Sequence, residues 1–215
     1  GNNTFVTVGG GGMIFTSSDG ITWDNRTSAS GTSNSLNGVT YGNSTFVTVG
    51  DSGTILTSSD GTSWDNRTSG RSTEFFGITY GNNIFVAVGK TSDGNISNTI
   101  GILTSSDGIS WDNRTTATSD YHWGVTYGNS KFVTVGGSGR NYYSSDGTTW
   151  TAGTINNTNF LYGITYGNSK FVAVGNSGTI ITSSDGTSFD NSTSGTSEEL
   201  RDVTYGNNTF VTVGG

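Results

Sequence analysis

One segment of about 40 residues recurs along the whole chain, and this repetition constrains the fold more than any other feature. The segment is marked by Ser-Ser-Asp-Gly-x-x-Trp, whose aspartates follow one another at steps of 41, 47, 39 and 39 residues. Two further signatures, (V/I)TYGN and FV(T/A)VG, recur once in each unit. A unit of this length cannot bury both faces of a sheet alone, so neighbouring units must stack on one another.

Each unit predicts four short antiparallel strands. In the second unit we expect them at 36–42, 44–50, 53–59 and 62–69, separated by turns rich in Gly, Asn, Asp and Ser. The chain has 35 Gly among 215 residues and no Pro, and it abounds in Thr and Ser, which favours strands and turns over helices. In FVTVG, the two valines lie on one face of the strand and the Phe and Thr side chains lie on the other. Both faces can therefore pack against neighbours, as expected for a sheet covered on both sides.

We therefore predict an all-β chain that forms one β-propeller domain over 1–215, with four-stranded blades stacked around a central axis. The predicted repeats, five full and one partial, are 1–35, 36–74, 75–121, 122–159, 160–198 and 199–215.

The first ten residues, GNNTFVTVGG, return letter for letter at 206–215. If five blades closed into a ring, the strand at 199–206 would pair with the first copy and leave the second copy displaced. Three alternatives follow. A larger ring borrows strands from another chain, the extra strand enters the open blade of a neighbouring molecule, or the chain is a segment of a longer repeat array. All three argue against a self-contained monomer, so we expect self-association through strand exchange or as a homopolymer.

Charge and composition exclude several kinds of partner. The net charge of −7 leaves no broad positive surface for nucleic acid or an anionic membrane. No apolar run approaches the roughly 20 residues of a membrane span. The chain has no Cys, and His122 is its only histidine, so we expect no metal site and no cofactor. We expect His122 to lie on the surface.

The segment SSDGTSWDN (58–66) and its siblings resemble the Asp-box, or BNR, repeat of sialidase-type and other bacterial propellers. The segment FVAVGNSGTIITSSDGTSF (171–189) resembles the BNR-like repeat of photosystem assembly-factor propellers. This resemblance covers essentially the whole chain and implies that the Asp boxes are structural. Independently, such an Asp can accept N–H bonds in its own turn, which the aromatic residue can cover. The residues expected in this role are Asp19, Asp60, Asp107, Asp146, Asp185, Trp23, Trp64, Trp111, Trp150 and Phe189.

A sialidase needs an arginine cluster and a Tyr/Glu nucleophile pair. One arginine recurs in the same slot of the outer strand in three units and is expected at the rim, as Arg26, Arg67 and Arg114. The other arginines occupy non-equivalent positions, and no motif joins them to the three glutamates. We predict that the protein is not an enzyme.

The units differ most just before their first strand, where a propeller chain reaches the mouth of the central channel. Aromatic residues gather in three of these segments, STEFFG (72–77), SDYHWG (119–124) and NTNFLYG (157–163). They either form a ring that binds a carbohydrate or fill the channel as ordinary core. The candidate ligand-binding residues are Phe75, Phe76, Tyr121, Trp123, Phe160, Tyr162 and Arg201.

Asn-x-Ser/Thr sequons are slightly more frequent than chance predicts, and four of them share one slot on the exposed outer strand. Glycans there would shield edge strands from pairing with other chains. The candidate sites are Asn25, Asn66, Asn113 and Asn191 in that slot, and Asn2, Asn43, Asn95, Asn156 and Asn207 elsewhere. With the low charge and the absence of Cys, they favour an extracellular or cell-surface protein.

The leading functional interpretation is a non-catalytic extracellular building block, structural or adhesive, which polymerises into a fibre or surface layer through its duplicated terminal strand. The alternative is a lectin-like propeller that binds carbohydrate with the aromatic residues at the channel mouth.

Overall fold

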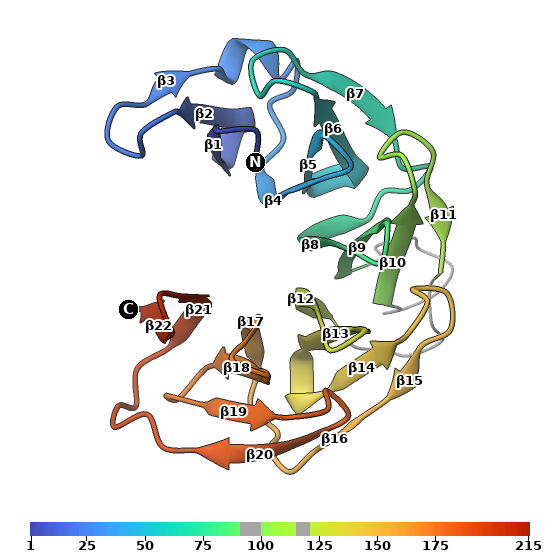
Figure 1. Cartoon of the computed structure of the whole chain (residues 1–215). Coiled ribbons are helices and arrows are strands. Elements are labelled where there is room, and N and C mark those ends of the chain that lie inside the picture. Colours follow the sequence, from blue (N-terminus) through green and yellow to red (C-terminus); the bar gives the residue numbers. More distant parts are fainter. Residues whose placement is uncertain (91–99, 115–120) are drawn as a thin grey trace.

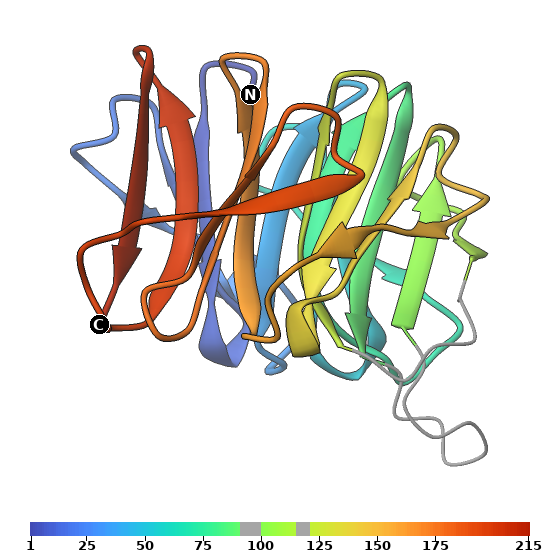
Figure 2. The same ribbon diagram turned by 90° about the horizontal axis from the view of Figure 1, so that it is seen from below.

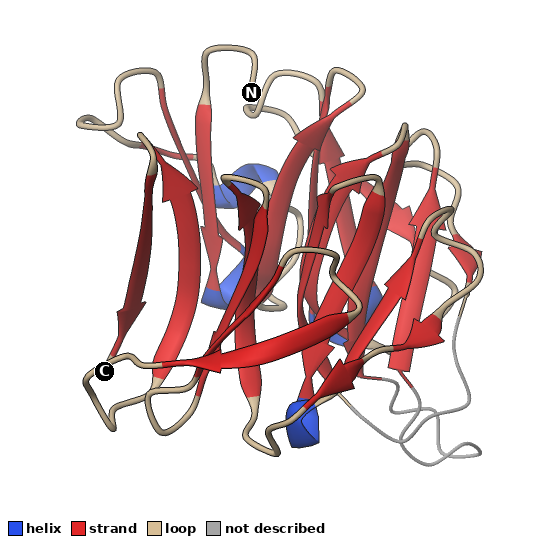
Figure 3. Cartoon of the chain, turned by 60° about the horizontal axis from the view of Figure 1, so that its bottom comes forward, coloured by secondary structure: helices blue, strands red, loops and turns tan. Residues whose placement is uncertain are grey.

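A computed structural model describes residues 1–90, 100–114 and 121–215. In this part of the chain, short antiparallel sheets follow one another around an arc, with the first strand of a complete sheet nearest the axis (Figure 1). Seen at right angles, the sheets form a row of stacked layers (Figure 2). Strands make up nearly all of the regular structure (Figure 3). The prediction of an all-β fold is confirmed.

The strands occupy four positions within the sheets. The innermost strands are β4 (Leu36–Gly42), β8 (Glu74–Gly81), β12 (His122–Gly128), β17 (Leu161–Gly167) and β21 (Leu200–Gly206). The second strands are β1 (Phe5–Gly9), β5 (Thr45–Gly50), β9 (Ile84–Lys90), β13 (Lys131–Gly136), β18 (Lys170–Gly175) and β22 (Thr209–Gly214). The third strands are β2 (Met13–Ser17), β6 (Thr54–Ser58), β10 (Ile100–Ser105), β14 (Asn141–Ser144) and β19 (Ile180–Ser183). The outer strands are β3 (Asp24–Asn25), β7 (Asp65–Thr68), β11 (Asp112–Asn113), β15 (Thr151–Ala152) and β20 (Ser188–Ser192).

Strands joined by short turns pair in the order of the sequence. Within the described residues, the first sheet has the three strands β1-β2-β3 and the last has only β21-β22, whereas the sheets between them contain all four positions. The fifth sheet gains β16 (Thr154–Ile155), which runs parallel to β20. In the described ranges, three 3₁₀ helices link second and third strands and one follows β3; they are η1 (Gly10–Gly12), η3 (Asp51–Gly53), η4 (Gly137–Gly139) and η2 (Thr27–Ala29).

The hydrophobic core lies between the sheets rather than inside any one of them. Val86 and Val88 of β9, for example, pack with Phe132 of β13, Tyr142 of β14 and Trp150, all of which belong to the next sheet. Four other clusters join neighbouring sheets. Each sheet therefore depends on its neighbours to bury its apolar side chains, as in other repeat proteins.

The two ends of the chain lie at the two ends of the arc (Figure 1). Strand β21 pairs with β22, from Gly206 opposite Thr209 to Leu200 opposite Gly214. It does not pair with β1, whose hydrogen-bonded neighbour is β2. The five-bladed closure in which 199–206 completes the first sheet is therefore not formed.

Candidate functional site

A β-bulge interrupts each innermost strand near its start. In β4 the pairing passes from Leu36 opposite Gly50 to Gly38 opposite Val49, which leaves the residue between them without a partner. The same shift occurs in β8, β12, β17 and β21. A bulge of this kind changes the direction in which the side chain of the extra residue points. The bulge residues are Asn37, Phe76, Trp123, Tyr162 and Arg201.

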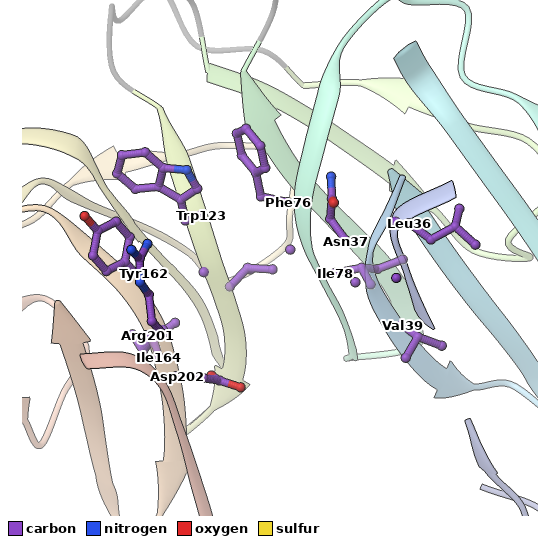
Figure 4. A pocket seen from close by; sticks show the side chains of 17 residues that line it. Leu36, Asn37, Val39, Phe76, Ile78, Trp123, Tyr162, Ile164, Arg201 and Asp202 are labelled. Carbon is purple, nitrogen blue, oxygen red and sulfur yellow. The ribbon is translucent and has the colours of Figure 1, made fainter. Parts of the chain in front are cut away.

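All five bulge residues line one open cavity of about 950 Å³ between the innermost strands, here called the channel. Figure 4 shows their side chains on the channel wall, with Phe76, Trp123 and Tyr162 following one another from sheet to sheet. The residue that follows each bulge is glycine, except in β21, where it is Asp202. The five units thus present the same backbone and five different side chains.

Trp123 is the centre of an aromatic cluster on this wall. Its ring centroid lies 6.3 Å from that of Phe76 and 5.3 Å from that of Tyr162. The rings of Phe160 and Tyr121 flank it at 5.6 and 6.2 Å. Phe76, Trp123 and Tyr162 are half-buried, so part of each ring faces the channel. Ordinary core residues would fill the channel, whereas these rings leave it open.

Polar groups continue the wall on both sides of the aromatic cluster. The Arg201 guanidinium lies over the Tyr162 ring, 4.9 Å from its centroid, and pairs with the carboxylate of Glu199. On the other side, the Asn37 amide donates hydrogen bonds to Asp51 Oδ1 at 2.8 Å and to a backbone carbonyl of β8 at 2.9 Å. The wall therefore passes from an amide through three aromatic rings to a guanidinium.

The structure separates the seven candidate ligand-binding residues into three groups. Four of them line the channel, namely Phe76, Trp123, Tyr162 and Arg201. Tyr121 and Phe160 contact Trp123 from outside that lining. Phe75 is fully buried between sheets with Val47 and Val49 of β5, so it cannot contact a ligand in the channel. The sequence analysis also missed two polar residues of the channel wall, the bulge residue Asn37 and Asp202, which follows the bulge of β21.

The expectation that His122 lies on the surface is wrong. His122 is fully buried, at the position that Leu36 and Leu161 occupy in other units. Its Nδ1 lies 2.8 Å from the Thr134 hydroxyl. Burial, with the nearby charge of Arg140, lowers the pKa of His122 to about 3. Aligning the repeats on this position would have revealed its place in the core.

The Asp-Gly turns lie between third and outer strands, away from the channel. Asp60 Oδ1 accepts the backbone N–H groups of Thr62 and Ser63 at 2.7 and 3.1 Å, and Ser58 also donates to it. A hydrogen bond from the Thr62 hydroxyl and the two backbone bonds hold the pKa of Asp60 below its usual value. The Trp64 indole donates to the carbonyl of the glycine in the turn. The same backbone bonds to the aspartate occur at Asp19, Asp107, Asp146 and Asp185.

The charged residues lining the channel are Arg201 and Asp202. The recurring arginines lie in or directly after the outer strands, and each pairs at 2.9 Å with an aspartate two residues earlier. Within the described residues, no three His, Cys, Asp or Glu side chains come together as a metal site. No helix in that part of the chain is long and apolar enough to span a membrane. The candidate glycosylation site Asn95 lies outside the described residues.

Comparison with known proteins finds similarity in structure alone, since no family model and no curated protein matches the sequence. A structure of YCF48 bound to D1 peptide is 19% identical with a TM-score of 0.72, over 100% of this chain and 72% of that one. YCF48 from Cyanidioschyzon merolae is 15% identical with a TM-score of 0.57, over 79% of this chain and 59% of that one.

A computationally designed protein, Ika8, is 11% identical with a TM-score of 0.59, over 94% of this chain and 65% of that one. At these identities the likeness concerns the fold alone. It supports an arrangement of β-propeller-type repeats in this chain.

Proposed function

We propose that the chain is a non-catalytic β-propeller-type scaffold that works by binding, with the channel wall as its recognition site for a carbohydrate. The observation that carries this proposal is the set of bulge residues. The innermost strands of three successive sheets place Phe76, Trp123 and Tyr162 side by side on the wall of one cavity. The backbone around them is repeated, and these side chains differ from unit to unit where they face the channel.

A carbohydrate suits this wall because a sugar ring has apolar C–H faces and polar hydroxyl groups around its edge. The aromatic rings of the wall can pack against the C–H faces of a sugar. The polar groups of Asn37, Arg201 and Asp202 can hydrogen-bond to its hydroxyl groups. The aromatic wall crosses three sheets, and the cavity of about 950 Å³ exceeds the volume of a single sugar. An oligosaccharide therefore fits the site better than a monosaccharide does.

The test is a glycan array followed by calorimetric titration of the best glycan against the wild type and Trp123→Asn. Asparagine is chosen because Asn37 holds the equivalent position in β4, so the fold accommodates it. We expect the variant to stay folded and to lose at least tenfold in affinity, with a melting temperature lowered by only a few degrees through the lost ring contacts. As a matched control, Ile21→Asn alters an exposed apolar residue outside the channel and should bind normally. Absence of glycan binding by the wild type, or binding to peptides alone, would overturn the proposal.

The proposal includes the absence of catalysis. The carboxylates of the Asp-Gly turns are engaged in their own turns, and Arg201 in the channel pairs with Glu199. A glycosidase needs two carboxyl groups facing each other across the sugar. Turnover of a fluorogenic sialoside or a related glycoside would contradict this part of the proposal.

A second candidate function is that of a structural building block, and the stacking of the sheets favours it. Each sheet buries its apolar side chains against a neighbouring sheet, so the repeats form one continuous stack. This function, like the first, suits an extracellular or cell-surface location, which we propose on the strength of the sequons on the outer strands. A loss of mass from the native protein on treatment with an N-glycan-releasing enzyme is the test of that location.

A further inference from the structure

A second set of side chains, here called the outer tier, lies beside the channel wall. Its members come two positions before each bulge residue. In every unit the carbonyl of this residue lies against a glycine near the end of the second strand, where a Cβ would come within 2.0 Å of the oxygen. The backbone is therefore the same in the five units, and the side chains occupy equivalent places. The outer tier consists of Ser35, Glu74, Tyr121, Phe160 and Glu199.

The outer tier continues the wall beyond the lining of the cavity. The rings of Tyr121 and Phe160 both contact the wall residue Trp123, with centroids at 6.2 and 5.6 Å. The carboxylate of Glu199 pairs with the wall residue Arg201. The aromatic surface of the channel therefore extends outward from Trp123 onto a second level.

Of the two aromatic residues of the outer tier, Phe160 is the one available to a ligand. The Lys90 ammonium lies over the ring of Tyr121, 4.8 Å from its centroid, and Tyr121 is half-buried. Phe160 is 44% exposed. Its ring is held between Trp123 and Gly137 of η4, where a Cβ would lie 3.6 Å from it. An exposed aromatic ring that is continuous with a cavity wall is typical of a ligand-binding surface.

The shape of this surface favours a chain of linked rings over one rigid ligand. The ring planes of Trp123 and Phe160 meet at 80°, so the surface turns a corner between the wall and the outer tier. An oligosaccharide can follow such a corner because the glycosidic bonds between its sugars rotate. One sugar can then lie against Trp123 and a later one against Phe160.

The charges of the two tiers favour a neutral ligand. The described residues of the wall and the outer tier contain one cation, Arg201, which is already paired with Glu199. They contain three carboxylates, those of Glu74, Glu199 and Asp202. The whole chain also carries a net charge of −7. An acidic sugar would therefore be repelled, whereas the hydroxyl groups of a neutral sugar can donate hydrogen bonds to the carboxylates.

We propose that the site takes a neutral oligosaccharide, with one part on the channel wall at Trp123 and the next part in an outer subsite formed by Phe160. The proposal rests on the carbohydrate binding proposed above and adds a substrate class and a specificity-determining residue to it. A glycan too short to reach Phe160 depends on the wall alone. Affinity should therefore rise with the length of the glycan until the outer subsite is occupied.

The test measures affinity against glycan length by calorimetry. The probes are cello-, chito- and manno-oligosaccharides from disaccharide to hexasaccharide, with oligogalacturonides and sialyllactose as acidic probes. Phe160→Ser removes the ring and is compatible with the fold, because Ser35 holds the equivalent position. Phe160→Tyr keeps the ring. Ile109→Thr is the matched control, since Ile109 is exposed in an Asp-Gly turn away from the channel and Thr62 holds the equivalent position.

We expect Phe160→Ser to bind the shortest ligand of the best neutral series within about twofold of the wild type and its longest ligands about fivefold more weakly. Phe160→Tyr and Ile109→Thr should keep the wild-type dependence on length. Trp123→Asn should weaken binding at every length. Melting temperatures show that each variant is folded.

Three results would overturn the proposal. The first is a wild type whose affinity is independent of glycan length, and the second is an equal loss at all lengths in Phe160→Ser, which would mean that Phe160 acts only by supporting Trp123. The third is tighter binding of the acidic probes than of the neutral series. Each of these leaves carbohydrate binding itself standing, whereas a wild type that binds no glycan on the array overturns both proposals.

Discussion

At the scale of single residues, His122 shows how one substitution in a repeat makes a pH-sensitive core. The Thr134 hydroxyl donates to the Gly124 carbonyl, so it accepts from His122 Nδ1–H, and Nε2 is the unprotonated nitrogen. Nε2 has no partner among the described residues, so protonating it would bury an unpaired charge.

We predict that stability falls on acidification and that His122→Leu removes this loss. The pKa of His122 is about 3 in the fold, below its ordinary value of 6.5, so below pH 6.5 the unfolded chain binds more protons. Between pH 6 and pH 4 the wild type should lose about 2–3 kcal/mol of unfolding free energy through this residue. Urea denaturation at both pH values measures the difference.

Leucine is the appropriate replacement because Leu36 holds the same position beside Thr48, whose hydroxyl donates to the Gly38 carbonyl at 2.8 Å. The lowered pKa values of the Asp-Gly turns also reduce stability below about pH 5, but they do so equally in the wild type and the variant, so the difference between the two reports on His122. An equal loss of stability in the wild type and the variant would show that other groups cause it.

At the scale of elements, the end of every innermost strand except β21 is a contact between sheets. Gly128 ends β12, and a Cβ there would lie 2.1 Å from the ring of Tyr166 in β17. We predict that Gly128→Ala destabilises the fold by about 1–3 kcal/mol, because the tyrosine must move out of a packed interface. Urea denaturation measures this loss.

Gly206 ends β21 in the same way and provides the matched control. It has no atom within 4 Å, so Gly206→Ala should change stability by less than about 0.5 kcal/mol at a concentration where the chain is monomeric. Equal effects of the two substitutions would indicate that the glycine is needed by the turn rather than by the neighbouring tyrosine.

Strand positions could be predicted from the sequence, whereas the direction of the channel residues could not. The expected strands of the second unit agree with β4 to β7 within three residues at each end, because turn residues and alternation mark them locally. Phe75 and Phe76 are adjacent and chemically alike, yet one is core and the other channel wall. The bulge decides between them, and it depends on pairing with another strand. His122 was misplaced for a related reason, since its environment comes from other sheets.

At the scale of the whole molecule, the same five-residue sequence lies in two different environments. FVTVG occurs in β13 and again in β22, with the same residues in the same kind of strand. In β13 both valines are buried, because β17 and the rest of the fifth sheet cover them. In β22 both are exposed. Position in the stack, rather than local sequence, therefore sets the local stability, as expected when each sheet is stabilised by its neighbours.

We predict that amide hydrogens of β22 exchange at least tenfold faster than those of β13 in dilute solution. The two strands share FVTVG, so their intrinsic exchange rates match and the difference reports on structure alone. β22 pairs only with β21, whereas β13 lies between β12 and β14. Hydrogen exchange followed by mass spectrometry measures both segments in one sample. Equal protection of the two strands at dilution would mean that the arc closes on itself.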